Sequence, residues 1–264
     1  MTNVTHPCFG EGCGFRIHLP IAKKCNTKCN YCKLVFSDVE KRPGASREIV
    51  ELGSVVPYIH ERLKKYRNCK IIGIAGPGDP LANPEETFGA FDLITENFHG
   101  FKKCLCTNGF NVTTYASQIE RVKLDYFTLT INSISVDTLW KIYDFVDYGD
   151  IRYSGHPSGE LVKELQKSAL DIVCGFEFMK VKVNIVYIPG INDGQMQEIL
   201  EFISTYNVSA VNIIPLIPVP DTKFAHVEEI PQDYFIGIRQ SLMNIYPNLS
   251  FMTNCQRCRS DACG

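Results

Sequence analysis

Apolar positions along the chain follow two different spacings, which predict two kinds of element. Short runs rich in β-branched and other apolar residues predict strands over residues 16–22, 70–75, 103–107, 126–131, 180–188 and 210–214. Between these runs, apolar residues recur every three or four positions, as on a helix with one buried face. The helical stripes are Ile49/Leu52/Val56/Ile59/Leu63, Phe88/Phe91/Phe98, Val112/Tyr115/Ile119/Val122, Val136/Leu139/Tyr143/Val146, Leu161/Leu165/Ala169/Ile172, Ile199/Phe202/Ile203/Tyr206 and Phe235/Ile238/Leu242/Ile245.

Strands and helices alternate, which predicts a parallel sheet with right-handed crossovers. Ser46 is placed to cap the helix of the first stripe, and Asn83 with Pro84 fits the N-cap and first position of the second. Six such strands suit a partial (βα)6 barrel, with an open doubly wound sheet as the alternative. Both folds place chemistry at the carboxyl ends of the strands, where this chain carries glycines, prolines and cysteines.

Composition narrows the class of protein. The 264 residues, with 45% apolar content, suit one α/β domain with a sizeable core. The net charge is -2 with a single Trp and no long basic block, so no nucleic-acid surface is expected. No apolar run approaches the roughly 20 residues that span a bilayer, so no membrane contact is expected. Twelve cysteines with no signal peptide ahead of Cys8 favour an intracellular metal protein over a disulfide framework, and hence a cytoplasmic location.

Three cysteines follow the first predicted strand, namely Cys25, Cys29 and Cys32. Spacings of three and then two residues allow one loop to close around one metal cluster. Three thiolates leave one iron of a [4Fe-4S] cube without a protein ligand, whereas a structural zinc site is usually closed by four ligands. A zinc knuckle or a chance grouping is the alternative. The spacing therefore predicts an iron-sulfur cluster with one iron open to a small molecule.

This motif, with Tyr31 just before its last cysteine, resembles the signature of the radical S-adenosylmethionine (radical SAM) enzymes. The resemblance implies that the open iron chelates the amino and carboxylate groups of SAM, donates an electron and yields a 5′-deoxyadenosyl radical. The predicted strands resemble the partial (βα)6 TIM-like barrel of these enzymes. We therefore expect a single radical SAM domain with an N-terminal ligand arm over residues 1–15, a barrel core over 16–230, and a C-terminal helix with a Cys-rich tail over 231–264.

A loop with little side-chain bulk follows the second strand, at Gly76-Pro77-Gly78-Asp79. Such a loop lets backbone carbonyls approach a bound cation such as the SAM ammonium. The resemblance places the glycine-rich SAM-binding motif here, although an ordinary tight turn is the alternative. Polar residues at later strand ends are further candidates for the SAM ribose and carboxylate, although asparagine there is as often a turn former. They are Thr130, Asn132, Ser133 and Asn184.

Most of the other nine cysteines gather where they could face the barrel mouth, which suggests further iron-sulfur clusters. Cys69 and Cys174 are expected to be core or surface thiols. The gathered residues are Cys8, Cys13, Cys104, Cys106, Cys255, Cys258 and Cys263. A free buried thiol is the alternative for each, and the pattern does not single out Cys106 or Cys263.

Several longer segments resemble the nitrogenase cofactor maturases of the NifB family, in order over nearly the whole chain. They are His6-Pro7-Cys8, Arg42-Pro43-Gly44, the nine residues from Ala75 to Asn83, Thr107-Asn108-Gly109, Ile188-Pro189-Gly190-Ile191-Asn192-Asp193 and the tail Cys255-x-x-Cys258-Arg259-x-Asp261-Ala262. That family joins two [4Fe-4S] clusters into an eight-iron core with a central carbide. The resemblance implies that SAM first methylates a cluster sulfide and that a 5′-deoxyadenosyl radical then abstracts hydrogen from this methyl group.

The same resemblance implies ligands for two further [4Fe-4S] clusters. His6, Cys8, Cys255 and Cys258 would hold these auxiliary clusters, and Cys104 would add a ligand from the third strand. The expected partners are SAM, iron-sulfur clusters as substrates, a reductant protein, and cluster-donor and cofactor-acceptor proteins.

The chain departs from the family pattern near Glu40. Three residues before this glutamate, where the family usually has a cysteine, the chain has Ser37, with Asp38 beside it. Cys13, Glu40 or Asp38 would have to substitute as a ligand, or one substrate cluster is bound differently. We hypothesise that Cys13 compensates, so that Cys13→Ala lowers both iron content and product formation. Full iron content and full product formation in that variant would contradict the hypothesis.

Two other functions stay open from the sequence. One is a radical SAM enzyme that modifies a peptide, RNA or small metabolite and keeps its auxiliary iron after turnover. The other is an iron-sulfur carrier or scaffold, which would not cleave SAM under strong reductant. The barrel pattern and the glycine loop argue against the carrier, since a carrier needs neither.

Overall fold

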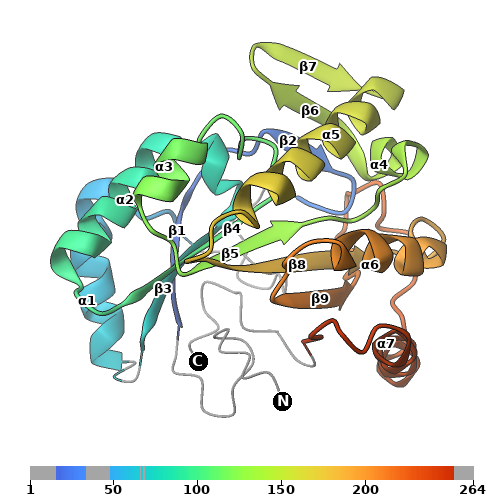
Figure 1. Ribbon diagram of the computed structural model, residues 1–264. Helices are drawn as coiled ribbons and strands as arrows, with labels where there is room; N and C mark the ends of the chain where they lie inside the picture. Colours follow the sequence, from blue (N-terminus) through green and yellow to red (C-terminus); the bar gives the residue numbers. More distant parts are fainter. Residues whose placement is uncertain (1–15, 34–47, 66, 68, 253–264) are drawn as a thin grey trace.

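A curved sheet of six parallel strands organises the protein (Figure 1). The computed structural model of the protein describes residues 16–33, 48–65, 67 and 69–252. The strands are β1 (Arg16–Ala22), β3 (Ile71–Pro77), β4 (Lys102–Thr107), β5 (Tyr126–Thr130), β8 (Lys180–Tyr187) and β9 (Ala210–Pro215). They lie in chain order, β1-β3-β4-β5-β8-β9. In a doubly wound sheet, the order of the strands reverses at a switch point. The order here has no such reversal, which is consistent with the predicted barrel and not with the doubly wound alternative.

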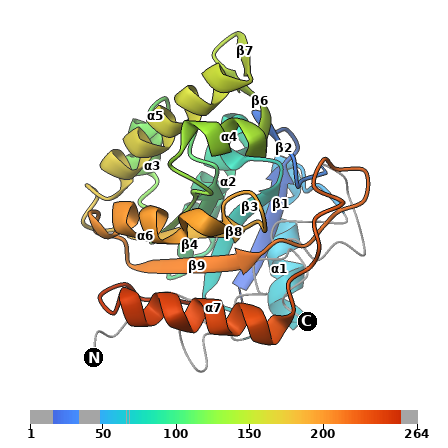
Figure 2. The same ribbon diagram turned by 90° about the vertical axis from the view of Figure 1, so that its right-hand side faces the viewer.

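Helices cover the outside of this sheet, as Figures 1 and 2 show. The α-helices are α1 (Val55–Lys65), α2 (Pro84–Asn97), α3 (Ala116–Arg121), α4 (Val136–Ile142), α5 (His156–Val173), α6 (Met196–Ser204) and α7 (Gln232–Ile245), and short 3-10 turns span Leu52–Ser54, Pro80–Ala82 and Asp193–Gln195. Outward strand residues such as Leu105 and Phe127 share one buried cluster with helix residues such as Ile59 and Phe91. This apolar layer fixes the helices, and the carboxyl ends of the strands stay free to carry polar loops.

A second, three-stranded antiparallel sheet was not predicted. It contains β2 (Thr27–Cys29), β6 (Tyr143–Tyr148) and β7 (Ile151–Ser154), in the order β2-β6-β7. The predicted helix through Tyr143 and Val146 is therefore wrong beyond Ile142, where α4 ends. Tyr143–Tyr148 is rich in aromatic residues, which favour strands, and pairs with β2 on one edge and β7 on the other. The β6–β7 hairpin projects from the body of the protein in both ribbon views.

Two predicted helices begin later in the chain than their apolar stripes. Val112 and Tyr115 lie in turns, with Val112 N donating to Gly109 O at 3.2 Å, and α3 begins only at Ala116. In the first stripe, α1 begins at Val55, after a 3-10 turn. The proposed cap Ser46 lies outside the described residues.

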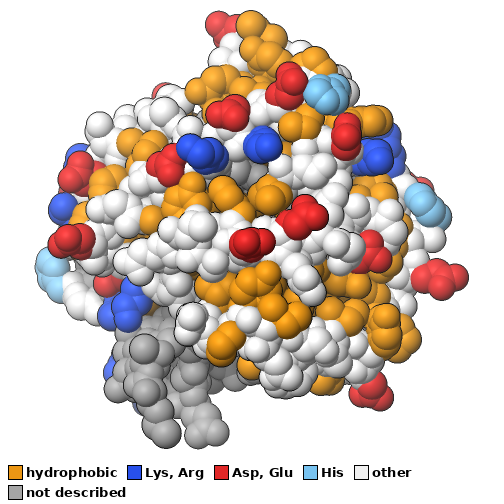
Figure 3. Space-filling model, turned by 45° about the vertical axis from the view of Figure 1, so that its right-hand side comes forward, with side chains coloured by type: hydrophobic (Ala, Val, Ile, Leu, Met, Phe, Trp, Pro, Cys, Tyr) orange, Lys and Arg blue, Asp and Glu red, His pale blue; other side chains and the backbone are white. Residues whose placement is uncertain are grey.

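The surface of the described chain mixes charges of both signs. In Figure 3, acidic and basic side chains are interspersed with apolar ones over the face in view. Among the residues that the structure defines, no helix combines the length and apolarity needed to cross a bilayer.

Candidate functional site

A pocket of about 610 Å³ opens at the carboxyl ends of the parallel strands. All three cysteines of the motif, Cys25, Cys29 and Cys32, line it, and each is partly exposed. The opposite walls come from the ends of β3, β4, β5, β8 and β9. The fold thus brings the cysteine loop and the strand ends to one place, as the sequence predicted.

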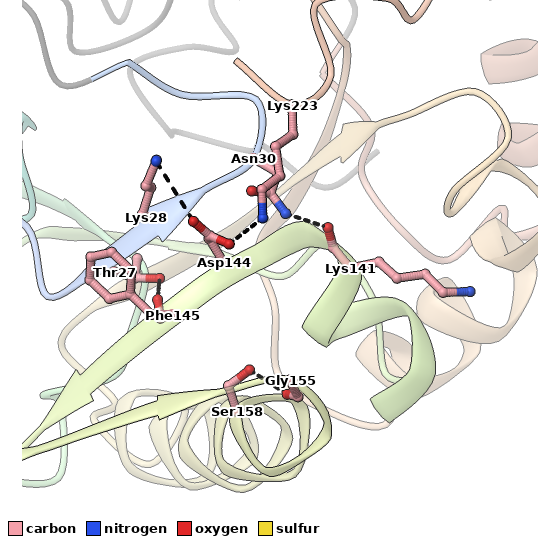
Figure 4. Close-up of polar contacts among 9 residues, drawn as sticks. All are labelled: Thr27, Lys28, Asn30, Lys141, Asp144, Phe145, Gly155, Ser158 and Lys223. Carbon is pink, nitrogen blue, oxygen red and sulfur yellow. Dashed lines mark hydrogen bonds and ion pairs between the residues drawn. The ribbon is translucent and has the colours of Figure 1, made fainter. Parts of the chain in front are cut away.

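Backbone pairing holds the cysteine loop in place. Thr27–Cys29 forms the edge strand β2 against β6, and the Thr27 hydroxyl donates to Phe145 O at 2.6 Å (Figure 4). Asn30 donates from its backbone to Ile142 O and from its side chain to Lys141 O, both at 2.7 Å. The unexpected small sheet is therefore the support of the cysteine loop.

The donor set fits a cluster with three protein ligands. Burial, and secondarily the negative charge of Asp79, raises the pKa of the Cys25 thiol. A metal that binds this thiol would displace its proton. In a cubane each cysteine binds a different iron, so the three thiols need not converge on one point. Within the described part of the chain, no three His, Cys, Asp or Glu side chains form a site for a single metal ion. The three pocket thiols match the ligand count of an open [4Fe-4S] cluster.

Gly78 lets the glycine loop touch the chain that leads into the cysteine motif. Gly78 N donates to Ala22 O at 2.7 Å, and Asp79 N donates to Lys24 O at 2.9 Å. A Cβ atom at Gly78 would lie 2.0 Å from Lys24 O and 2.9 Å from Ala22 O, which are backbone atoms that cannot swing aside. Only glycine permits this contact, so the loop and the cysteine motif are fixed relative to each other.

Asn83 clamps the same segment from the other side. Its amide nitrogen donates to Lys24 O and to Asp79 O, each at 2.8 Å, and its amide oxygen accepts from Lys24 N at 3.1 Å. The sequence correctly predicts Asn83 as the N-cap position of α2, but its side chain makes no capping bond. This functional role was missed, because the partner lies far away in the sequence.

We expect Asn83→Ala to loosen the cysteine motif without unfolding the protein. The loss leaves the Lys24 N–H group without its Asn83 acceptor and removes one of the two hydrogen bonds that Lys24 O accepts, which costs about 1–3 kcal/mol of the free energy of unfolding. The variant should melt at a lower temperature and lose iron faster to a chelator than the unchanged protein. Asn97→Ala, an exposed asparagine at the other end of α2, is the matched control. Equal melting and equal iron loss in the two variants would contradict the clamp.

Asp79 joins the glycine loop to the end of β4. It lines the pocket, yet its carboxylate accepts hydrogen bonds from Leu81 N, the Thr107 hydroxyl and Asn108 N at 2.7–2.9 Å. Burial raises the pKa of this carboxyl, and these hydrogen bonds oppose the rise. Its oxygens are thus occupied by the protein, and it orders the loop that carries Gly76, Pro77 and Gly78.

The four candidates at later strand ends separate into two pairs. Thr130 and Asn184 line the pocket, as expected of residues that contact SAM. Asn132 and Ser133 are buried and do not line it.

Their side chains bind within the protein instead. The Asn132 amide donates to the Tyr31 hydroxyl at 3.0 Å and accepts from Val186 N, and the Ser133 hydroxyl donates to Gln195 at 2.7 Å. The Asn132 amide also donates to the Tyr143 hydroxyl at 3.3 Å, and both tyrosines line the pocket, so Asn132 reaches the site through Tyr31 and Tyr143.

Charged residues at the pocket mouth were not predicted. The Asp144 carboxylate lies between Lys28, at 3.7 Å, and Lys223, and the hydrogen bond from Lys223 lowers the pKa of Asp144 (Figure 4). A second ion pair joins Lys33 to Asp221 at 2.6 Å. These pairs tie the segment after β9 across the cysteine motif. In the sequence, the prolines from Pro215 to Pro220 are the feature from which an ordered loop could have been predicted there.

The two cysteines of β4 lie on the same face at different depths. Cys106 lines the pocket, whereas Cys104 is 0% exposed and clusters with Ile71 and Tyr126. Cys104 as a cluster ligand stays a prediction. The other predicted ligands of the auxiliary clusters lie outside the described residues, namely His6, Cys8, Cys13, Cys255 and Cys258. Ser37 also lies outside them.

Comparison with known proteins identifies the family. Residues 19–203 match the radical SAM superfamily. Over 98% of its length the chain is 35% identical to the FeMo cofactor biosynthesis protein NifB of Methanocaldococcus infernus, of which it covers 85%. It is 34% identical to the NifB protein of Chlorobaculum tepidum and 33% identical to that of Klebsiella pneumoniae, and it spans only 61% and 56% of their lengths.

Solved structures show the same fold at low identity. The crystal structure of Streptococcus suis SuiB bound to S-adenosylmethionine matches with a TM-score of 0.62 at 14% identity, covering 91% of this chain and 50% of that one. Methylornithine synthase matches with a TM-score of 0.59 at 13% identity, covering 90% of this chain and 64% of that one. Motif, fold and relatives agree, and the chain belongs to the radical SAM superfamily and, within it, to the NifB family of FeMo cofactor biosynthesis proteins.

Proposed function

We propose that the protein fuses two [4Fe-4S] clusters, with a carbon atom from SAM, into the eight-iron precursor of the nitrogenase cofactor. The observation that carries this proposal is the shared pocket of Cys25, Cys29 and Cys32 with the glycine loop, in a chain related to NifB proteins along 98% of its length. Because the chain spans 61% of the Chlorobaculum tepidum relative, its substrates and partners are part of the proposal.

Different residues of the pocket would hold the resident cluster and the different groups of SAM. Cys25, Cys29 and Cys32 hold the resident [4Fe-4S] cluster, which supplies the electron for reductive cleavage of SAM when bound. Backbone carbonyls of the Gly76-Pro77-Gly78 loop accept hydrogen bonds from the SAM ammonium. Thr130 and Asn184 line the same pocket, and their polar side chains would bind the ribose hydroxyls and carboxylate. Tyr31 closes one wall, positioned by Asn132, while Asp79 and Ser133 order the loops behind.

Two molecules of SAM would be consumed in each fusion. The first donates its methyl group to a sulfide of a substrate cluster and leaves as S-adenosylhomocysteine. The second would be cleaved to methionine and 5′-deoxyadenosine, with one electron supplied by the resident cluster and one hydrogen atom taken from the methyl group on the substrate cluster. The substrate clusters would be held by His6, Cys8, Cys104, Cys255 and Cys258, with Cys13 in place of the family cysteine at Ser37. A reductant protein would supply the electrons, and donor and acceptor proteins would deliver and remove clusters.

Anaerobic reconstitution with iron and sulfide tests the proposal. Three four-iron clusters require about twelve irons per chain. Addition of SAM and dithionite should then release both S-adenosylhomocysteine and 5′-deoxyadenosine. With a trideuterated SAM methyl group, deuterium should appear in the 5′-deoxyadenosine. About four irons per chain, or 5′-deoxyadenosine without S-adenosylhomocysteine, would favour a radical SAM enzyme acting on another substrate. Absence of SAM cleavage would favour a cluster carrier.

A further inference from the structure

The Tyr31 phenol comes from the same turn as two of the three cluster cysteines. Cys32 N donates to Cys29 O at 3.0 Å, which closes a turn with Tyr31 at its third position. The side chains of all three residues line the pocket. Cys29 and Tyr31 also pack against one apolar cluster, to which Tyr143 belongs. The phenol therefore lies in apolar surroundings beside the thiols that bind the resident cluster.

One side-chain amide fixes how the Tyr31 hydroxyl is used. The Asn132 amide oxygen accepts from Val186 N at 2.9 Å, which leaves the amide nitrogen to bind the phenols. This nitrogen carries two hydrogens, and it donates to the Tyr31 hydroxyl at 3.0 Å and to the Tyr143 hydroxyl at 3.3 Å. The Tyr31 oxygen is thus an acceptor toward Asn132, and its own hydrogen has to be donated to another group.

The described part of the chain supplies no acceptor for this hydrogen. Among the described residues, the bond from Asn132 is the only hydrogen bond of the Tyr31 hydroxyl. Burial, followed by the charge of Cys29, raises the pKa of Tyr31, so the Cys29 sulfur lies near the hydroxyl. A donor in apolar surroundings is destabilising unless it finds an acceptor. The acceptor is therefore expected among the groups that bind in the pocket.

Sulfur atoms of the resident cluster fit this role. The cluster would be held by Cys29 and Cys32, which lie on both sides of Tyr31 in the turn. Hydrogen bonds to the sulfurs of an iron-sulfur cluster help to set its reduction potential. A donor stabilises the reduced cluster, which carries one more negative charge, more than the oxidised cluster. A hydrogen bond from Tyr31 would therefore raise the potential.

We propose that the Tyr31 hydroxyl donates a hydrogen bond to a sulfur atom of the resident cluster and so raises its reduction potential. Asn132 is a positioning residue, because its amide nitrogen keeps the hydroxyl hydrogen directed away from itself. The inference rests on the part of the proposed function that assigns the resident cluster to Cys25, Cys29 and Cys32. It does not depend on the fusion of substrate clusters.

Tyr31→Phe tests the inference, because phenylalanine keeps the ring and removes only the hydroxyl. The reconstituted variant would be titrated with reductant in the absence of SAM, and the reduced cluster would be followed by electron paramagnetic resonance. The signal of the resident cluster is the one that changes when SAM is added afterwards. At a given potential, the ratio of reduced to oxidised resident cluster should fall about 10-fold, which corresponds to a reduction potential about 59 mV more negative. The iron content should stay unchanged.

Tyr115→Phe is the matched control, since Tyr115 is a partly buried tyrosine outside the pocket that packs against Phe88. It should keep the potential of the unmutated protein. Equal potentials in Tyr31→Phe and Tyr115→Phe would overturn the inference while leaving the proposed function standing. Failure of the unmutated protein to bind a cluster that responds to SAM would instead overturn the proposed function.

The hydrogen bond itself can be observed in the unmutated protein. After exchange into D₂O, electron nuclear double resonance of the reduced resident cluster should show a coupled deuteron that is absent from Tyr31→Phe and present in Tyr115→Phe. Asn132→Asp keeps an oxygen for Val186 N and offers the hydroxyl an acceptor instead of a donor. This variant should lose the same deuteron although it retains Tyr31. An identical deuteron spectrum in the unmutated protein and Tyr31→Phe would overturn the inference.

Discussion

The Gly78→Ala protein is expected to lose about 99% of its SAM cleavage while keeping its fold. The new methyl group would lie 2.0 Å from Lys24 O, so the glycine loop and the cysteine motif must separate. Overpacking of this kind costs about 1–3 kcal/mol of the free energy of unfolding. The larger effect is on chemistry, because a shift of about 1 Å between reacting groups can slow a reaction about 100-fold. The rate of 5′-deoxyadenosine formation under dithionite measures this effect.

Gly53→Ala provides the control for that substitution. Gly53 lies in the 3-10 turn before α1, and a Cβ atom there would meet nothing within 4 Å. It should cleave SAM at the rate of the unchanged protein. If Gly78→Ala formed 5′-deoxyadenosine as fast as Gly53→Ala and bound as much iron, the close contact between the two loops would not matter for SAM cleavage.

Cys29→Ser is expected to abolish SAM cleavage altogether. Cys29 lines the pocket and ends β2, so its backbone is held by β6 while its thiol faces the pocket. Serine preserves that backbone but offers a hydroxyl, which binds cluster iron poorly compared with a thiolate. The variant should lose the resident cluster, seen as about four fewer irons per chain, together with all 5′-deoxyadenosine formation.

Cys174→Ser separates this effect from a general sensitivity to cysteine loss. Cys174 caps the C-terminus of α5, outside the pocket, and burial raises the pKa of its thiol to about 11. It should retain full iron and full SAM cleavage. Detectable 5′-deoxyadenosine from Cys29→Ser at the level of Cys174→Ser would contradict the assignment of the resident cluster to this motif.

Local patterns in the sequence predicted the parts of the fold that depend on local residues. The run from Arg16 to Ala22 is β1 with the predicted bounds, and the cysteine motif follows it into the pocket. The same kind of evidence failed at Tyr143–Tyr148, where apolar residues fit both a helical stripe and a strand. Pairing with Thr27–Cys29 decides for the strand, and that partner is distant in the sequence.

The site shows the same division between local and distant partners. The sequence showed a glycine loop, but it did not show that Gly78 must be glycine because the backbone of Lys24 lies against it. Asn83 was predicted only as a cap of the nearest helix, whereas its side chain binds the backbone of Lys24. Alternation along β4 could not separate Cys104 from Cys106, since both lie on one face.

The fate of the SAM methyl carbon tests the central claim most directly. The reconstituted protein would be turned over with methyl-¹⁴C SAM and dithionite, and the released cluster would be separated from protein and small molecules under anaerobic conditions. We expect ¹⁴C to travel with a cluster of about eight irons, at one carbon per cluster, with matching amounts of S-adenosylhomocysteine and 5′-deoxyadenosine. Label recovered in a peptide, RNA or metabolite, or cleavage of SAM with no label in any cluster, would contradict the assembly function.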